Sequence, residues 1–181
     1  SMGGMIVQQM AIDSSERLLS MTSIMSTTSE PGLPEASGEA LKVLTEPPPP
    51  RDDIEALIDH TLRNRKVVGG DGFSDGPEAR AQTRAIIERQ FYPAGTARQR
   101  GAVMASGPRT KALKSINVPT LVIHGDKDSL VPVEGGIHTA ETIPGARLEI
   151  LKGMGHAQFP MYQQQVIGLI IEHVNSNSAE I

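Results

Sequence analysis

Residues 117–133 read NVPTLVIHGDKDSLVPV, and this stretch decides how the rest of the chain is interpreted. The apolar run LVI at 121–123 is rich in β-branched residues and ends abruptly in His124, which is typical of a strand buried in a parallel sheet. Two carboxylates, Asp126 and Asp128, follow at once, on the loop where α/β sheets place their ligand sites. The stretch therefore predicts an α/β fold with a functional loop directly after this strand.

A second strand is predicted at residues 147–151, with Leu148 and Ile150 on one face. The loop behind it reads KGMGH and ends in His156. Because the carboxyl ends of parallel strands meet at one edge of a sheet, we expect His156 to lie near the carboxylates. An acid and a histidine are two parts of a hydrolytic catalytic group, and the remaining part is a nucleophile.

The candidate nucleophile is Ser1, because residues 1–4 read SMGG and a helical pattern continues to residue 12. A sharp strand-to-helix turn of this kind exposes a serine oxygen, and glycines suit places where backbones crowd together. The segment resembles the second half of the nucleophile elbow G-x-S-x-G of the α/β-hydrolase family. The family's chain order is serine, acid, histidine, and Ser1, Asp128 and His156 occur in that order. The resemblance covers nearly the whole chain, but it begins in the middle of the family's fold.

The resemblance implies a Ser-His-Asp triad of Ser1, His156 and Asp128, and no cofactor or metal. In the family the acid sits three residues after the glycine of H-G-D-K-D, which selects Asp128, with Asp126 as the alternative. The backbone N–H of Met2 would be one donor of the oxyanion hole, and the other donor would lie upstream of Ser1. Since five strands normally precede the elbow, we expect an upstream segment of about a hundred residues to complete the fold.

The implied activity is hydrolysis of a small-molecule carboxylic ester through an acyl-enzyme. The elbow helix and the segment after it loosely resemble methylesterases that act on polyketide antibiotics. The same fold also serves haloperoxidase-like perhydrolases, C–C bond hydrolases and non-catalytic binding proteins, and these stay alternatives. Ser1 as a first residue also fits an N-terminal-nucleophile hydrolase, although the strand–helix alternation does not. Ser1 and Met2 could instead be the remnant of a removed tag, which would leave Gly3, Gly4 and the helix behind them unexplained.

The resemblance divides the chain into three parts: residues 1–29 with the nucleophile, its helix and a strand at 18–25; a helical lid at 30–114; and residues 115–181 with the acid and the histidine. The whole is expected to be a mostly parallel sheet with helices on both faces. Helices are predicted at 34–44, from a cap at Asp52 or Asp53 through Leu62, at 77–92, at 96–105, at 133–142 and at 163–174, and the tail 175–181 is polar.

Composition limits the partners of this chain of 181 residues. A net charge of −4 argues against a nucleic-acid partner, and no apolar run is long enough for a membrane span. The chain contains no cysteine, so it has neither disulfides nor thiol chemistry. A cytoplasmic location is expected. His124 is expected to pack at the strand end and shape the acid loop, whereas the remaining histidines lie on helix patterns and are expected to be solvated or packed: His60, His138 and His173.

Overall fold

The computed structural model describes residues 1–157 and 160–178, and its centre is a sheet of three parallel strands. These are β1 (Met21–Ile24), β2 (Thr120–Gly125) and β3 (Arg147–Leu151), in that order across the sheet. In the register, Met21 lies opposite Thr120, and Leu121 lies opposite Arg147. Every residue of β2 is buried, which explains a sequence without polar alternation. The expected α/β fold with a parallel sheet is confirmed.

The two outer strands differ from the prediction in detail. β1 is shorter than the expected strand at 18–25, because a 3-10 turn, η1 (Ser15–Arg17), precedes it and Leu18 N–H donates to the Ser15 carbonyl. β3 has the predicted bounds, but it is an edge strand and Ile150 is 44% exposed.

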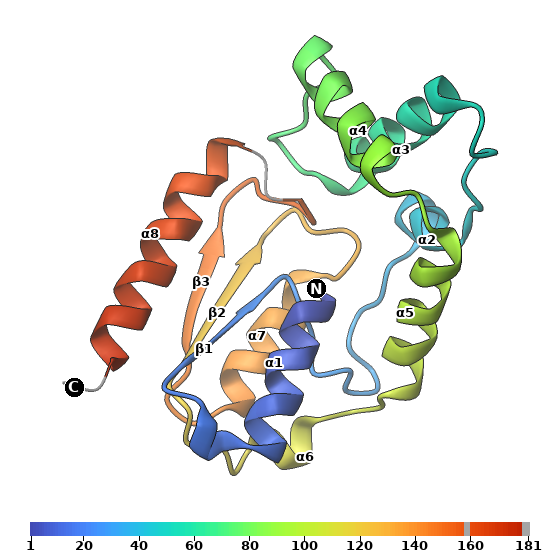
Figure 1. Cartoon of the computed structure of the whole chain (residues 1–181). Helices are drawn as coiled ribbons and strands as arrows, with labels where there is room; N and C mark the ends of the chain where they lie inside the picture. The colour runs from blue at the N-terminus through green and yellow to red at the C-terminus, as the bar shows by residue number, and fades with distance from the viewer. Residues whose placement is uncertain (158–159, 179–181) are drawn as a thin grey trace.

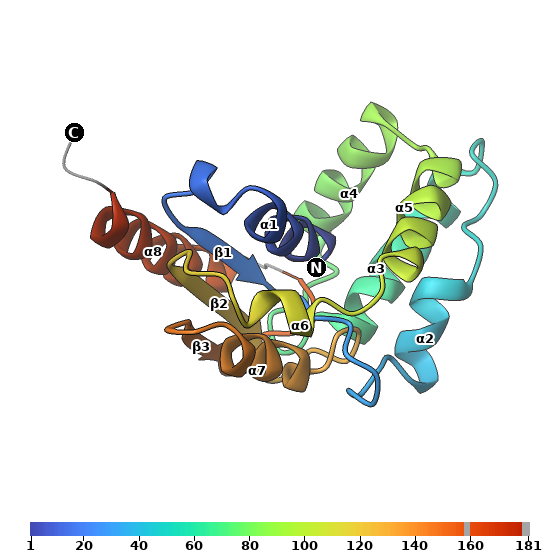
Figure 2. The same ribbon diagram turned by 90° about the horizontal axis from the view of Figure 1, so that it is seen from below.

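Helices cover both faces of the sheet, as Figures 1 and 2 show. The helices α1 (Met2–Asp13) and α7 (Val133–Thr142) lie on one face, and α8 (Pro160–Asn177) lies on the other. A short helix, α6 (Thr110–Leu113), packs near the base of α1 and α7. Two apolar clusters fill these layers. The cluster under α8 includes Ile123, Leu151 and Val166, and the cluster under α1 and α7 includes Ala11, Leu113 and Ile143.

The face of α1 that meets the sheet is not its most apolar face. Its apolar stripe includes Ile6 and Met10, yet these residues are 49% and 47% exposed. The residues that face the sheet are small or polar, namely Gly4, Gln8 and Ala11. A Cβ at Gly4 would lie 2.5 Å from the Cβ of Ser26, so a larger residue there would force α1 away from the sheet.

A helical insertion (residues 30–106) leaves the core after β1 and returns before α6. It contains α2 (Gly38–Thr45), α3 (Ile54–Val68), α4 (Pro77–Arg89) and α5 (Pro93–Ala105). Asp53 caps α3, since its carboxylate accepts the Ala56 N–H at 3.0 Å. The insertion has a small core of its own, and α3 and α4 lie beyond the carboxyl ends of the strands (Figure 1).

Arg109 joins the two ends of this insertion. Its backbone N–H donates to the Thr28 carbonyl at 2.9 Å, and its guanidinium donates to the Thr27 carbonyl at 2.8 Å and to Ser29 Oγ at 3.2 Å. The same guanidinium donates to Gln8 of α1 at 3.0 Å. Arg109 is 4% exposed, and burial lowers the pKa of its guanidinium. A buried cation thus holds the exit and the return of the insertion against α1.

None of the helices in the described part of the chain combines the length and the apolar character that a bilayer span requires.

Candidate active site

The acid loop (residues 126–131) is built around the carboxylate of Asp128. Its Oδ1 accepts the N–H groups of Leu130 and Val131 at 2.9 and 2.8 Å, which fixes the loop as a tight turn. Its Oδ2 faces two imidazoles: His156 Nδ1 at 2.8 Å and His124 Nε2 at 3.4 Å. One oxygen therefore anchors the loop, and the other is left for the histidines.

The histidine loop (residues 152–156) brings His156 to this carboxylate. Because a carboxylate can only accept, the proton of the neutral ring lies on Nδ1 and leaves Nε2 as the free basic nitrogen. The His156 side chain is 10% exposed, so it is largely shielded from water and keeps an open side. The arrangement has the geometry of an oriented general base.

The second imidazole, His124, is fully buried at the end of β2. Its Nε2 donates to the Val131 carbonyl at 2.8 Å and lies beside the Asp128 carboxylate. Its Nδ1 has no hydrogen-bond partner among the described residues, and a Cβ at Gly136 would lie 2.4 Å from that nitrogen. The glycine of α7 therefore makes room for the ring.

Burial of the Asp128 carboxyl works to raise its pKa, but hydrogen bonds from His124 and His156 outweigh this effect. The balance, with help from the charge of His156 and the Val131 N–H, lowers the pKa of Asp128 to about 2. Asp128 therefore stays ionised throughout the range in which an imidazole can act as a base.

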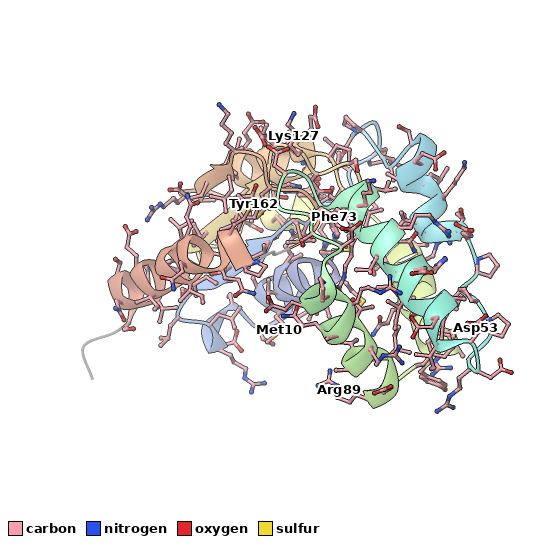
Figure 3. All side chains as sticks on the ribbon, turned by 90° about the horizontal axis from the view of Figure 1, so that it is seen from above. Met10, Asp53, Phe73, Arg89, Lys127 and Tyr162 are labelled. Atoms are coloured by element: carbon pink, nitrogen blue, oxygen red, sulfur yellow. The ribbon has the colours of Figure 1, made fainter. Side chains whose placement is uncertain are left out.

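Asp126, the alternative acid, does not contact His156. It is exposed, and its Oδ1 accepts the Gly153 N–H at 2.6 Å, so it joins the acid loop to the histidine loop. Figure 3 views the molecule from this end and labels Lys127 of the acid loop, Tyr162 of α8 and Phe73 of the insertion.

Ser1 lies at the same edge of the sheet, at the N-terminus of α1 (Figure 1). Its nitrogen donates to the Ile24 carbonyl at the end of β1 at 2.6 Å. Desolvation lowers the pKa of the α-amino group to about 6, and the charge of Asp128 works against this shift. The Met2 N–H belongs to the first turn of α1, where N–H groups have no partner within the helix.

The structure thus brings Asp128 and His156 into contact and places Ser1 at the same edge of the sheet. The two glycines behind Ser1 differ in how closely other atoms surround them. A Cβ at Gly3 would meet no atom within 4 Å, whereas Gly4 is needed for the approach to β1. His124 packs at the strand end and bonds to the acid loop, as expected, but its contact with the Asp128 carboxylate was not predicted. The other histidines are hydrogen-bonded on helices: His60 to Arg63 and Asn64, His138 to Thr28 and His173 to Met21.

No group of three or more histidine or carboxylate side chains with metal-site geometry occurs within residues 1–157 and 160–178. The candidate site consists of the Asp128–His156 pair and the N-terminus of α1.

No family model matches the chain. Among curated proteins, it is 27% identical to a rhodomycin D methylesterase of Streptomyces peucetius, across 87% of this chain and 59% of that protein. It is also 27% identical to a pimeloyl-(acyl-carrier protein) methyl ester esterase of Aeromonas hydrophila, across 96% of this chain and 67% of that protein. A non-heme chloroperoxidase of Kitasatospora aureofaciens is 44% identical over 48 residues, which are 26% of this chain and 18% of that protein.

Solved structures give the same fold. A meta-cleavage product hydrolase from Pseudomonas fluorescens matches with a TM-score of 0.74 at 18% identity, covering 98% of this chain and 63% of that one. An esterase from a Rhodococcus species matches with a TM-score of 0.68 at 20% identity, covering 97% and 62%. The chain thus spans about two-thirds or less of the length of these relatives. The chain has the α/β-hydrolase fold, and its named relatives are esterases, other hydrolases and haloperoxidases of that superfamily.

Proposed function

We propose that this protein is a serine hydrolase that cleaves carboxylic esters through an acyl-enzyme on Ser1. The observation that carries the proposal is the 2.8 Å contact between His156 Nδ1 and Asp128 Oδ2, at the sheet edge where α1 begins. A serine hydroxyl is a weak nucleophile until a base takes its proton, and an imidazole held by a carboxylate is such a base.

In this scheme Ser1 Oγ attacks the ester carbonyl carbon while its proton moves to His156 Nε2. Asp128 keeps the ring oriented and stabilises the imidazolium. The imidazolium returns the proton to the departing alkoxide, so the alcohol leaves and the acyl group stays on Ser1. Water then loses a proton to His156 and attacks the acyl carbon, the carboxylic acid departs, and Ser1 regains its proton.

The negative oxygen of the tetrahedral intermediate would be stabilised by the Met2 N–H. This group sits at the N-terminus of α1, where unpaired N–H groups and the helix dipole favour negative charge. A second donor is expected from a segment upstream of Ser1.

The substrate class that we propose is the methyl ester of a carboxylic acid. The two relatives described above that align across most of this chain are both named for cleavage of methyl esters. The groove beside α1 is apolar, with Met2, Ile6 and Met10 in its lining, and suits the carbon skeleton of such an ester.

The test is an intact-mass spectrum of the protein with and without a fluorophosphonate probe, followed by hydrolysis of methyl and p-nitrophenyl esters. Because the chain spans about two-thirds of its relatives, the sample is the longest natural form that contains these residues. One adduct on Ser1 is expected, with no adduct in Ser1→Ala. His156→Ala and Asp128→Asn should lower kcat about a thousand-fold or more.

A folded sample that forms no adduct and hydrolyses no ester would overturn the proposal and favour a non-catalytic binding protein. Activity that survives His156→Ala would contradict the role of His156 as the general base.

A haloperoxidase-like activity is the second candidate, since a relative that is 44% identical over 48 residues is a non-heme chloroperoxidase. It would use the same acyl-enzyme, with hydrogen peroxide in place of water as the attacking nucleophile. Peroxide added to the ester assay then diverts the acyl group to a peracid. Peracid yields that exceed the yield of the free acid at equal nucleophile concentration would make this the main activity.

We also infer that the open edge of β1 is completed by a further segment of the same polypeptide. β1 pairs with β2 on one side, and no other strand in the described part of the chain pairs with it. An unpaired parallel edge is a site for aggregation. A soluble, folded monomer that consists of residues 1–181 alone would contradict this inference.

A further inference from the structure

We propose that residues 68–71 of the helical insertion, here called the clamp, position His156 by holding the histidine loop through backbone contacts. This inference builds on the proposed function, because it assigns the insertion a role toward the general base. Gly70 is the positioning residue, since it allows the two backbones to approach.

Three backbone hydrogen bonds join the clamp to the histidine loop. The His156 N–H donates to the Val68 carbonyl at 2.6 Å, and the Gly155 N–H donates to the Gly69 carbonyl at 3.2 Å. In the other direction, the Asp71 N–H donates to the Gly153 carbonyl at 2.8 Å. Gly70 and Met154 form an antiparallel bridge between these bonds. The two segments therefore pair like a short piece of sheet.

The clamp begins at Val68, the last residue of α3, and the contact satisfies carbonyls that a helix leaves unpaired at its C-terminus. Val67 O accepts from Ser129 Oγ of the acid loop at 3.2 Å, and the next two carbonyls accept from the histidine loop. α3 thus ends directly on both loops of the candidate site.

The two backbones approach so closely that glycine is required in both segments. A Cβ at Gly70 would lie 2.3 Å from the Gly153 carbonyl oxygen, and a Cβ at Gly155 would lie 2.2 Å from the Val68 carbonyl oxygen. Gly70 also has a φ of +69°, which favours glycine. Gly145 has nearly the same φ, +71°, but open space around it, so freedom of φ alone does not explain Gly70.

The clamp acts on His156 rather than on the acid. Asp128 is fixed by N–H groups within its own loop, as described above. The histidine loop is held on one side by the acid loop, where Lys127 N–H donates to the Met154 carbonyl at 3.0 Å. On the other side only the clamp, among the described residues, accepts the N–H of His156. A shift of α3 therefore changes the distance between His156 and a fixed Asp128.

The test compares Gly70→Ala with Gly145→Ala, which has the same penalty in φ but no neighbour to displace. Hydrogen exchange at the Gly155 and His156 amides should be at least ten times faster in Gly70→Ala and unchanged in Gly145→Ala. The Nδ1 proton and nitrogen signals of His156 should move in Gly70→Ala alone. In the esterase assay kcat should fall about ten-fold or more with KM nearly constant, because a displaced catalytic group lowers the rate of the chemical step.

Equal exchange and equal His156 signals in the two variants would overturn the clamp. These readouts need no turnover, so they stay decisive if the protein proves not to be an esterase. If Gly70→Ala does not fold, Ser129→Ala serves instead, because it removes the bond that holds Val67, the residue directly before the clamp, to the acid loop. It should raise exchange at His156 a few-fold, with recovery in Ser129→Thr, and an unchanged rate would count against the proposal.

Discussion

The helical insertion meets the core along two borders that differ in kind. At the first, here called the closed border, the clamp bonds to the histidine loop through its backbone, and glycines allow the close approach. At the second, here called the open border, α5 runs beside α1 and none of the residues of α5 is buried. A cavity of about 570 Å³ separates the two helices, and its lining includes Met2, Ile6, Met10, Ala102, Val103 and Ser106.

The difference teaches that the insertion is held at its middle and at its ends rather than along its length. The clamp holds its middle, and Arg109 holds its ends. α5, with the sequence PAGTARQRGAVMA, has no continuous apolar face, and so it leaves the border beside α1 open. The closed border reaches the candidate catalytic histidine, and the open border leaves room for a ligand.

The largest effect is expected at the closed border. Gly155→Ala would place a methyl group 2.2 Å from the Val68 carbonyl oxygen, where no side-chain end can move aside. We expect the free energy of unfolding to fall by about 3 kcal/mol. Urea unfolding followed by circular dichroism measures this change, and a loss below about 1 kcal/mol would mean that the clamp and the histidine loop separate easily.

The carboxylate of Asp128, which contacts His156 next to the closed border, gives a pH-dependent effect on stability. The pKa of Asp128 is lowered to about 2 in the folded protein, so its ionised form adds stability above the ordinary pKa near 4. This contribution is lost as the pH falls from about 4 toward 2. Asp128→Asn should therefore cost about 2 kcal/mol at pH 7 and little at pH 2.

Unfolding of both proteins in urea at a series of pH values tests this. Glu39→Gln is the control, because that carboxylate pairs with Lys42 on the exposed surface of α2 and adds little. A gap between wild type and Asp128→Asn that is independent of pH would contradict the role of ionisation.

At the open border the sign should reverse. Gly101 lies inside α5, and a Cβ there would meet no atom within 4 Å. Alanine favours the helix over glycine, so Gly101→Ala should raise the free energy of unfolding by about 0.5–1 kcal/mol. Thermal unfolding followed by circular dichroism shows this as a higher Tm. A lower Tm would mean that α5 packs closely against a partner at this position.

The smallest effect is expected from Met10→Gln, on the side of α1 that lines the cavity (Met10 is labelled in Figure 3). Met10 is 47% exposed, so its replacement should change the free energy of unfolding by about 0.5 kcal/mol or less. A loss of more than about 1 kcal/mol in urea would show that this border is closed in solution.

The elements that the sequence predicted best are those with strong local signals. α7 and β3 have the predicted bounds of 133–142 and 147–151, and Asp53 caps α3 as one of the two expected residues. β2 follows from its apolar run. Hydrophobic patterning and caps act within a few residues, so a single sequence carries them.

Two features needed information that local patterns lack. The buried face of α1 consists of Gly4, Gln8 and Ala11, because close approach to β1 favours small residues over the apolar stripe. The clamp joins residues 68–71 to residues 153–156, and periodicity does not report such distant pairing. The two glycine-rich stretches were visible, but nothing in the sequence indicated that they meet.

Because Arg109 holds the two ends of the helical insertion together, the insertion can vary in length without disturbing the core. The residues where the insertion leaves the core are bound to the guanidinium of Arg109, where the insertion returns. The distance between the two ends is therefore fixed, whatever the length of chain between them. The entropy of closing a loop grows only slowly with its length, so insertions of other sizes that keep the clamp could be grafted between Ser29 and Gly107 at small cost. Divergence of specificity could then proceed in the insertion while the strands and the acid loop stay unchanged.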